Sequence, residues 1–292
     1  MQLLINALIA GSLAALLAGG LAFVYGVLGA FNVALGQMAL SGGYATWWLQ
    51  AHGVPLSLSI LGGLLFSVVI SVLTFEIFVN PFYRHHRFLP LVTTIAWSMI
   101  LDGILLFSFG GQPRNIVSDA AKKPFHILGA TMNNPQAILI LSTIVLLLLC
   151  AYILHSTAFG RRIRAVVQHE HAAMSLGIPA GLLSRILFIS SGVLACFAGI
   201  FLGIDQNLTP AFGFALTIKA YAAVIAGGKG NVWGAVVCAY LIALIEQLIV
   251  GVHWFGRFYF PAGFQSTISL LIIIGVLLIK PSGLFRSSAR VA

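Results

Sequence analysis

Residues 136–178 read QAILILSTIVLLLLCAYILHSTAFGRRIRAVVQHEHAAMSLGI, in which an uncharged apolar run is followed by a basic loop. A helix of about 20 apolar residues crosses the roughly 30 Å hydrocarbon core of a bilayer, and the run Gln136–Leu154 approaches that length. Apolar side chains recur in the loop at three- and four-residue steps, at Ile163, Val166, Val167, Ala173 and Met174. This period predicts a helix with one apolar stripe between two membrane-spanning segments.

The composition of the whole chain indicates an all-α polytopic membrane protein. The 292 residues are 60% hydrophobic and 7% charged, and the mean hydropathy is +1.05. A soluble domain of this size needs a more polar surface. The formal charge of +9 lies in short clusters between apolar runs, which argues against nucleic acid as a partner. Three cysteines, Cys150, Cys196 and Cys238, lie within apolar runs and are expected to be buried packing residues.

Nine segments are apolar enough to be membrane helices, with eight to ten as the expected range. They cover residues 3–28, 35–49, 56–79, 89–109, 136–154, 186–204, 211–226, 233–250 and 263–279. The first has no Lys or Arg before it, so we expect a retained segment and not a secretory signal. The second and seventh are short, with ends that we expect to be broken by Gly42, Gly43, Gly227 and Gly228. Such segments indicate discontinuous helices beside a transport path.

The distribution of basic residues predicts the orientation of the chain. One set of loops holds ten, namely Arg84, Arg87, Arg161, Arg162, Arg164, Arg185, Lys229, Lys280, Arg286 and Arg290. The opposite set holds four, namely Arg114, Lys122, Lys123 and Arg257. Because cytoplasmic loops are enriched in Lys and Arg, the larger set predicts the cytoplasmic side. With nine crossings, the N-terminus is outside and the C-terminus inside.

A weak internal similarity suggests an inverted repeat within one membrane domain, residues 1–292. A shift of 177 residues aligns Ala34, Gly36, Tyr44 and Ala45 with Ala211, Gly213, Tyr221 and Ala222. The halves would be residues 1–110 and 183–281, with the fifth segment and a cytoplasmic loop, residues 156–183, between them. Inverted repeats place a shared pathway at their interface.

Two outer loops are long enough to carry structure or contacts of their own. Residues 110–135 contain three prolines and are expected to form a small cap with short elements. Residues 251–263, GVHWFGRFYFPAG, are rich in aromatic residues. They are either an aromatic belt at the lipid headgroups or a contact for an external binding protein.

Ionisable side chains inside apolar segments are the candidates for a pathway, because charges in a bilayer are costly. Asp102, Lys219 and Glu246 lie deep in their segments, whereas Glu76 and Arg185 lie near inner ends, from which long side chains can reach the interface. The deep three are either helix-to-helix bonds and a structural ion pair, or groups that steer a zwitterionic solute or relay protons. Neutral candidates beside the first short segment are Asn32 and Gln37.

Sequence motifs for catalysis or nucleotide binding are absent, so we predict a non-enzymatic chain without cofactor or metal. The sequence has no GxSxG or HExxH motif and no GxxxxGK[ST] phosphate loop. GGKGN, Gly227–Asn231, has the wrong spacing and no Ser or Thr after its lysine. If transport is driven by ATP, the ATPase is another chain.

Four stretches together resemble the permeases of branched-chain amino acid ABC transporters, specifically the LivH-type subunit. They span nearly the full chain: GAFNVALGQMALSGGYA (Gly29–Ala45), NPFYRHHRFLPLVTTIAWSMIL (Asn80–Leu101), TAFGRRIRAVVQHEHAAMSLGI (Thr157–Ile178), and IKAYAAVIAGGKGNVWGA (Ile218–Ala235) followed by Glu246 and KPSGLF (Lys280–Phe285). Two positions depart from the family pattern: Leu35 stands where a His is common, and His169 where Asn is common. The first departure leaves the solute less certain than the family.

The resemblance implies a multi-pass subunit of a bacterial inner-membrane importer for branched-chain or related small amino acids. Its partners would be a LivM-type permease, two cytoplasmic ABC ATPases and a periplasmic amino-acid-binding protein. Relatives that carry short amides or urea keep those solutes open. A stand-alone ion-coupled transporter is the alternative of a different class.

The same resemblance identifies Thr157–Ile178 as similar to the loop that rests on the ATPase. The residues expected to couple the two subunits are Gly160, Arg161, Arg162, Arg164, Ala172, Ala173 and Gly177. The apolar stripe would enter a groove on the partner, and the arginines would meet acids at its rim. Binding of the arginines to anionic lipid is the simpler alternative, but it does not account for the stripe or the small residues.

Overall fold

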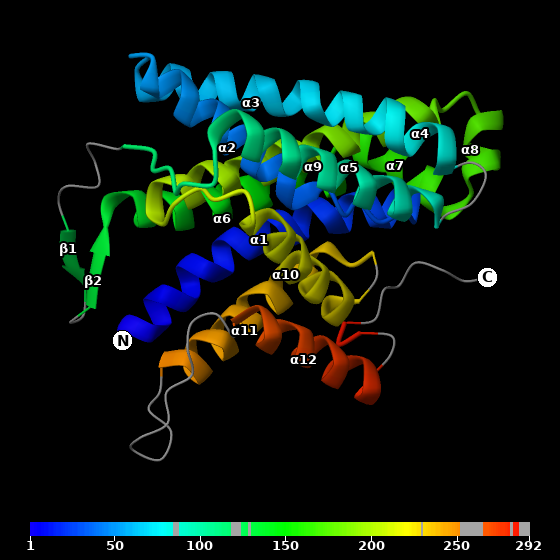
Figure 1. Cartoon of the computed structure of the whole chain (residues 1–292). Helices are drawn as coiled ribbons and strands as arrows, with labels where there is room; N and C mark the ends of the chain where they lie inside the picture. The colour runs from blue at the N-terminus through cyan, green and yellow to red at the C-terminus, as the bar shows by residue number, and fades with distance from the viewer. Residues whose placement is uncertain are drawn as a thin grey trace.

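The computed structural model describes residues 1–83, 88–117, 124–127, 130–228, 230–251, 265–280 and 283–285. Each of the nine predicted apolar segments corresponds to a helix (Figure 1). These helices are α1 (Gln2–Leu28), α2 (Leu35–Ala51), α3 (Leu56–Leu73), α5 (Leu89–Phe109), α6 (Asn134–Ser156), α9 (Ala180–Asp205), α10 (Phe212–Gly227), α11 (Val232–Gly251) and α12 (Gln265–Ile279). The predicted all-α polytopic membrane fold is therefore confirmed.

The third predicted segment is longer than expected and changes its helical geometry. After α3 the chain continues through a π-helical turn, η1 (Thr74–Val79), into the short helix α4 (Asn80–Tyr83). A π-turn leaves backbone carbonyls without their usual i+4 donors. Side chains of α5 reach this turn: Thr93 Oγ1 donates to the Phe78 carbonyl, and Trp97 Nε1 donates to Thr74 Oγ1 at 2.8 Å.

Six helices of the described chain are long and apolar enough to cross a membrane. They cover Gln2–Leu28, Leu56–Tyr83, Leu89–Phe109, Asn134–Ser156, Ala180–Asp205 and Val232–Gly251. The helices α2, α10 and α12 are shorter, as predicted for the first two, and the number of crossings stays a prediction. In the bilayer core no water is available to backbone N–H and C=O groups, and a helix bonds these groups within itself.

The expectation that Gly42 and Gly43 break the second segment was wrong. The helix α2 continues through both glycines to Ala51, because they are contact positions and not helix ends. A Cβ on Gly42 would collide with Cys196 Sγ, and one on Gly43 would lie 2.9 Å from the Gly199 carbonyl oxygen, both on α9. Gly227, in contrast, is the last residue of α10, as expected.

The helix α1 is the centre of the molecule. It packs against α9, α10 and α11, and its middle residues are buried among their side chains. The helices α3, α5 and α6 lie further out and turn many apolar side chains outward, as lipid-facing helices do. Cys196 and Cys238 are buried free thiols, and Cys150 is partly buried, in keeping with their predicted packing role.

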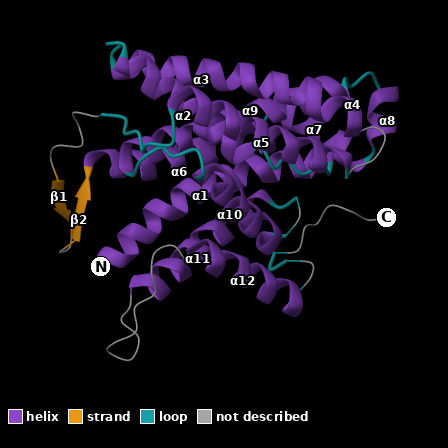
Figure 2. Ribbon diagram, in the orientation of Figure 1, coloured by secondary structure: helices purple, strands orange, loops and turns teal. Residues whose placement is uncertain are grey.

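The two ends of the helical bundle differ. The N-terminus and a two-stranded hairpin lie at one end, whereas α4 and α8 (Glu170–Ser175) lie at the other (Figure 1). The hairpin, β1 (Pro124–Ile127) and β2 (Ala130–Asn133), is antiparallel, with Pro124 opposite Asn133 (Figure 2). It supplies the short elements expected of the outer cap.

Several predicted loop residues lie outside the part of the chain that the structure describes. These are Arg84, Arg87, Lys122, Lys123, Lys229, Arg257, Arg286, Arg290 and most of the aromatic loop 251–263. Of the described basic residues, Arg161, Arg162 and Arg164 belong to α7 (Ala158–Gln168) and Arg185 belongs to α9, all at the α8 end. The backbone of Arg114 forms an isolated β-bridge with that of Leu208, which lies in the loop between α9 and α10.

Candidate functional site

The predicted coupling loop contains two helices and not one. The helix α7 (Ala158–Gln168) begins at Thr157, whose Oγ1 accepts a hydrogen bond from the Gly160 N–H at 3.3 Å. It ends at His169, where the backbone is extended, and α8 then runs from Glu170 to Ser175. The single helix predicted for this loop is therefore interrupted at His169.

The apolar stripe of this segment packs against its own chain. Ile163 and Val166 are each 5% exposed, and with Ala173 they form a cluster with Leu183 and Leu187 of α9. The expectation that Ile163 and Val166 project into a partner was wrong, because α9 already buries them. The apolar side chains that remain on the surface are Met174, 45% exposed, and Leu176, 82% exposed.

Ala173 and Gly177 have a structural explanation within the chain. The Gly177 N–H donates to the Met174 carbonyl at 2.9 Å, and the Ile178 N–H donates to the Ala173 carbonyl at 3.0 Å. Gly177 has φ +79, so this is a Schellman motif closed by a left-handed glycine. Ala173 is buried in the cluster against which Ile178 packs, whereas Ala172 is exposed.

The four other predicted coupling residues occupy different places. Arg161 and Arg162 are exposed on α7. Arg164 turns back and donates through Nη1 to the Leu154 carbonyl at the end of α6. Gly160 is buried against the same carbonyl, and a Cβ at this position would collide with it. The α6–α7 corner thus needs Gly160, whereas Arg161 and Arg162 are free to meet another molecule.

Asn32 stabilises the start of α2. Its Oδ1 accepts from the Ala34 N–H at 3.1 Å, and its Nδ2 lies 3.6 Å from Met38 Sδ. Two threonines of other helices complete this start. Thr94 Oγ1 accepts from the Val33 N–H at 3.1 Å, and Thr217 Oγ1 accepts from the Gly36 N–H at 3.0 Å. Asn32 therefore closes a turn just before α2, and sequence reasoning missed both threonines.

The short helices α2 and α10, which the weak internal similarity aligns, are in contact at their N-terminal turns. A Cβ on Gly36 would collide with the Gly213 carbonyl, so the two backbones touch. Thr217, one turn further along α10, also donates to the Val33 carbonyl at 3.2 Å. The inverted halves themselves remain a proposal, but the aligned stretches lie side by side.

Lys219 and Glu246 form a buried ion pair. Lys219 Nζ on α10 lies 2.9 Å from Glu246 Oε2 on α11, and the Glu246 side chain is 3% exposed. Ser269 of α12 donates to the other carboxylate oxygen, so the pair joins three helices. Both charges are satisfied by each other and by a hydroxyl, which is what a structural pair in a membrane requires.

Asp102 has a different environment. Gln37 Nε2 donates to Asp102 Oδ1 at 3.2 Å and to the Pro210 carbonyl at 3.2 Å. These two acceptors identify which atom of the Gln37 amide is the nitrogen, so the remaining amide atom is Oε1. Gln37 Oε1 is buried and has no hydrogen-bond donor among the described residues. No Lys, Arg or His of the described chain forms an ion pair with Asp102, which is partly exposed.

Glu76 and Arg185 form an ion pair that sequence reasoning missed. Arg185 Nη2 lies 2.5 Å from Glu76 Oε1, and Asn80 Nδ2 donates to the other oxygen at 3.2 Å. Both were predicted at inner segment ends, and that shared depth was the available signal. Among the described residues, no three His, Cys, Asp or Glu side chains gather as metal ligands do.

Comparison with known proteins identifies the family. A family described as "Branched-chain amino acid transport system / permease component" matches residues 3–279. The "Probable branched-chain amino acid transport permease protein LivH" of Methanocaldococcus jannaschii is 30% identical, over 97% of this chain and 91% of that protein. This chain belongs to the branched-chain amino acid transport permease family. The resemblance predicted from the four motifs is confirmed.

Other members of the permease family match over the same length. BraD of Pseudomonas aeruginosa, a "High-affinity branched-chain amino acid transport system permease protein", is 25% identical over 97% of this chain and 95% of its own. LivH of Escherichia coli, with the same description, is 23% identical over 97% and 94%. The chain is thus a multi-pass permease component of a transport system.

A solved structure shares the fold. A chain of "PsaBC from Streptococcus pneumoniae in complex with Fab" aligns with a TM-score of 0.53 over 97% of this permease and 93% of that chain. The sequence identity is 12%, so the likeness concerns the helical architecture alone.

Proposed function

We propose that this permease is the LivH-type membrane subunit of an ATP-driven importer for branched-chain or related small amino acids. The single observation that carries the proposal is the family match along the whole chain. The importer would lie in a bacterial inner membrane, with the α8 end in the cytoplasm and the N-terminus in the periplasm. A LivM-type permease would complete the path, a periplasmic amino-acid-binding protein would deliver the solute, and two ABC ATPases would supply energy.

The surface proposed to dock an ATPase is the exposed part of α7 and α8. It consists of Arg161, Arg162, Ala172, Met174 and Leu176. Two cations beside two exposed apolar side chains match an interface with an apolar centre and a charged rim. The buried stripe supports the role indirectly, because it attaches α7 and α8 to α9, the helix that also contacts α1, α2 and α3. A movement of the ATPase would therefore be transmitted to the core.

Copurification and a matched pair of variants test the docking surface. The tagged chain should bring down a P-loop ATPase and a periplasmic binding protein. The double variant Met174→Ser/Leu176→Ser should lose most of the ATPase while it inserts normally. Val117→Ser removes an equally exposed apolar side chain from the loop after α5, at the opposite end, and should retain the ATPase. Full ATPase recovery with the double variant would contradict docking through this surface.

Within the proposed pathway, Asp102 and Gln37 are the residues we expect to contact the solute. An ionised carboxylate at membrane depth needs a cation, and Glu246 has Lys219, whereas the partner of Asp102 in the described part of the chain is the Gln37 amide. The ammonium group of an amino acid would supply the missing charge. Lys219, Glu246 and Asn32 would then have structural roles beside the pathway and would not contact the solute.

Two other functions make different predictions for Asp102. A permease for short amides or urea carries a neutral solute, so loss of the Asp102 charge would matter little. An ion-coupled transporter would work as the purified chain alone under an ion gradient and would depend on Asp102 for proton or cation binding. The observation that favours the ion-coupled transporter is that Asp102 has no counter-ion among the described residues.

A further inference from the structure

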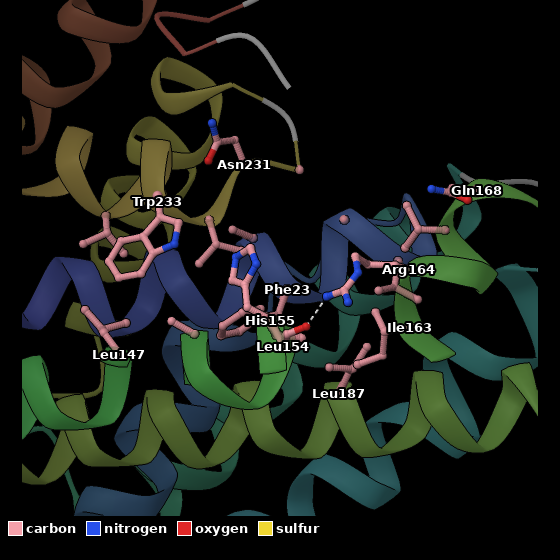
Figure 3. Close-up of a pocket in the computed structure, with 18 of the residues that line it drawn as sticks. Phe23, Leu147, Leu154, His155, Ile163, Arg164, Gln168, Leu187, Asn231 and Trp233 are labelled. Carbon is pink, nitrogen blue, oxygen red and sulfur yellow. Dashed lines mark hydrogen bonds between the residues drawn. The ribbon is translucent and has the colours of Figure 1, made fainter. Parts of the chain in front are cut away.

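A cavity of about 700 Å³ lies between α1, α6, α7 and α11, on the α8 side of the bundle (Figure 3). Its walls come from segments far apart in the sequence, including Phe23, Leu147, Leu187 and Val236. These side chains form an apolar interior. Neither the proposed pathway nor the docking surface uses this space, although α7 forms one of its walls.

The polar groups that line this cavity are cationic or neutral. They are Arg164 and His155, which lie near each other in Figure 3, together with Gln168, His169 and Asn231. The residues that line the cavity include no Asp or Glu. Arg164 uses Nη1 for the Leu154 carbonyl, and its exposed guanidinium retains further donors.

The cavity reaches the molecular surface, because His155 and Trp233 in its lining are exposed, and two of the helices that wall it, α6 and α11, carry exposed apolar side chains. On α6, Leu148 next to Leu147 is 55% exposed, and on α11, Val237 next to Val236 is 42% exposed. Trp233 lines the cavity and is itself partly exposed, as tryptophan commonly is at the headgroup level. An apolar interior with a cationic rim beside a Trp side chain matches the two parts of an anionic phospholipid.

We propose that this cavity binds an anionic phospholipid, with an acyl chain along Phe23, Leu147 and Val236 and the phosphate at Arg164 and His155. The charge complementarity of the rim favours a negative headgroup over a zwitterionic one. Since α7 is a wall of the site, the lipid would support the segment that carries the docking surface. The inference does not depend on the identity of the solute.

Fluorescence quenching by brominated lipids tests the site. The complete transporter, purified with its partner subunits, is placed in nanodiscs that contain brominated phosphatidylglycerol or brominated phosphatidylcholine. The signal of Trp233 is the difference between the wild type and Trp233→Phe. We expect Trp233 to be quenched at least twofold more by the glycerol lipid than by the choline lipid.

A pair of charge-matched variants separates the cavity from general surface charge. Arg164→Gln should abolish the preference for the glycerol lipid. Lys280→Gln removes an exposed positive charge after α12, outside both the cavity and the docking surface, and it should leave the preference intact. Equal quenching by both lipids in the wild type would overturn the proposal. A Trp233 signal that neither lipid quenches would also overturn it, and would indicate a cavity covered by a partner subunit.

Discussion

Asp102 and Glu246 are both carboxylates in membrane helices, but among the described residues Glu246 alone has a counter-ion. Glu246 is 2% exposed and is paired with Lys219, whereas the described partner of Asp102 is the neutral amide of Gln37. The sequence presented the two as equal candidates, because depth in an apolar segment says nothing about contacts between helices. Charge compensation separates a residue that holds the fold from one that is available to a solute.

Asp102→Asn should lower amino-acid uptake at least tenfold while membrane insertion is unchanged. Asparagine keeps the size of the side chain and an oxygen for the Gln37 bond, so the loss would report the charge. Asp205→Asn is the control, since Asp205 accepts from Gln136 at 2.7 Å at the opposite end from α8. Radiolabelled leucine uptake in cells measures both. A fully active Asp102→Asn would mean that the neutral side chain suffices, against the ammonium assignment.

Glu246→Gln should destabilise the protein, because it leaves the partly buried Lys219 without its charge partner. Loss of one member of a buried pair costs about 3 kcal/mol or more, and apolar replacement of both members is often nearly neutral. We therefore expect a lower melting temperature for Glu246→Gln and a recovery for Lys219→Met/Glu246→Leu, measured on purified protein. A stable Glu246→Gln variant without uptake would instead place the pair in the pathway.

The α7–α8 element illustrates what a helical period can and cannot establish. The recurrence of Ile163 and Val166 correctly predicted an amphipathic helix, but not the surface that would cover it. That surface is α9, whose register on α7 depends on the tight corner at Gly160. The break at His169 was likewise unpredicted, since no Gly or Pro marks it.

Gly177→Ala should destabilise the loop and uncouple the transporter. A left-handed backbone costs an L-residue about 1–2 kcal/mol, and Gly177 has φ +79 with open space around it. Gly53 also has a positive φ, +83, and open space, but it lies between α2 and α3. Gly53→Ala should thus lower the melting temperature similarly and leave substrate-stimulated ATPase activity unchanged. Equal activity in both variants would argue against coupling through this turn.

At the scale of the molecule, the apolar segments were predictable and the contacts among helices were not. Length and hydropathy alone locate nine helices, because a bilayer selects for them. The Glu76–Arg185 pair joins residues more than a hundred positions apart, and the contact of Gly36 with Gly213 joins α2 to α10. Both contacts arise from tertiary packing, and the hydrophobic pattern of a sequence does not show which helices pack together. The two segments predicted to be short, α2 and α10, are short in the structure.

In the proposed function, this permease moves amino acids with energy from a separate ATPase that docks on α7 and α8. The most direct measurement is uptake of radiolabelled leucine by proteoliposomes that hold the complete transporter, with binding protein outside the vesicle lumen and ATP inside. We predict uptake that requires ATP hydrolysis, is lost in Arg161→Glu/Arg162→Glu, and is unaffected by collapse of ion gradients. Uptake by the permease chain alone, driven by an ion gradient without ATP, would show that transport does not depend on a separate ATPase.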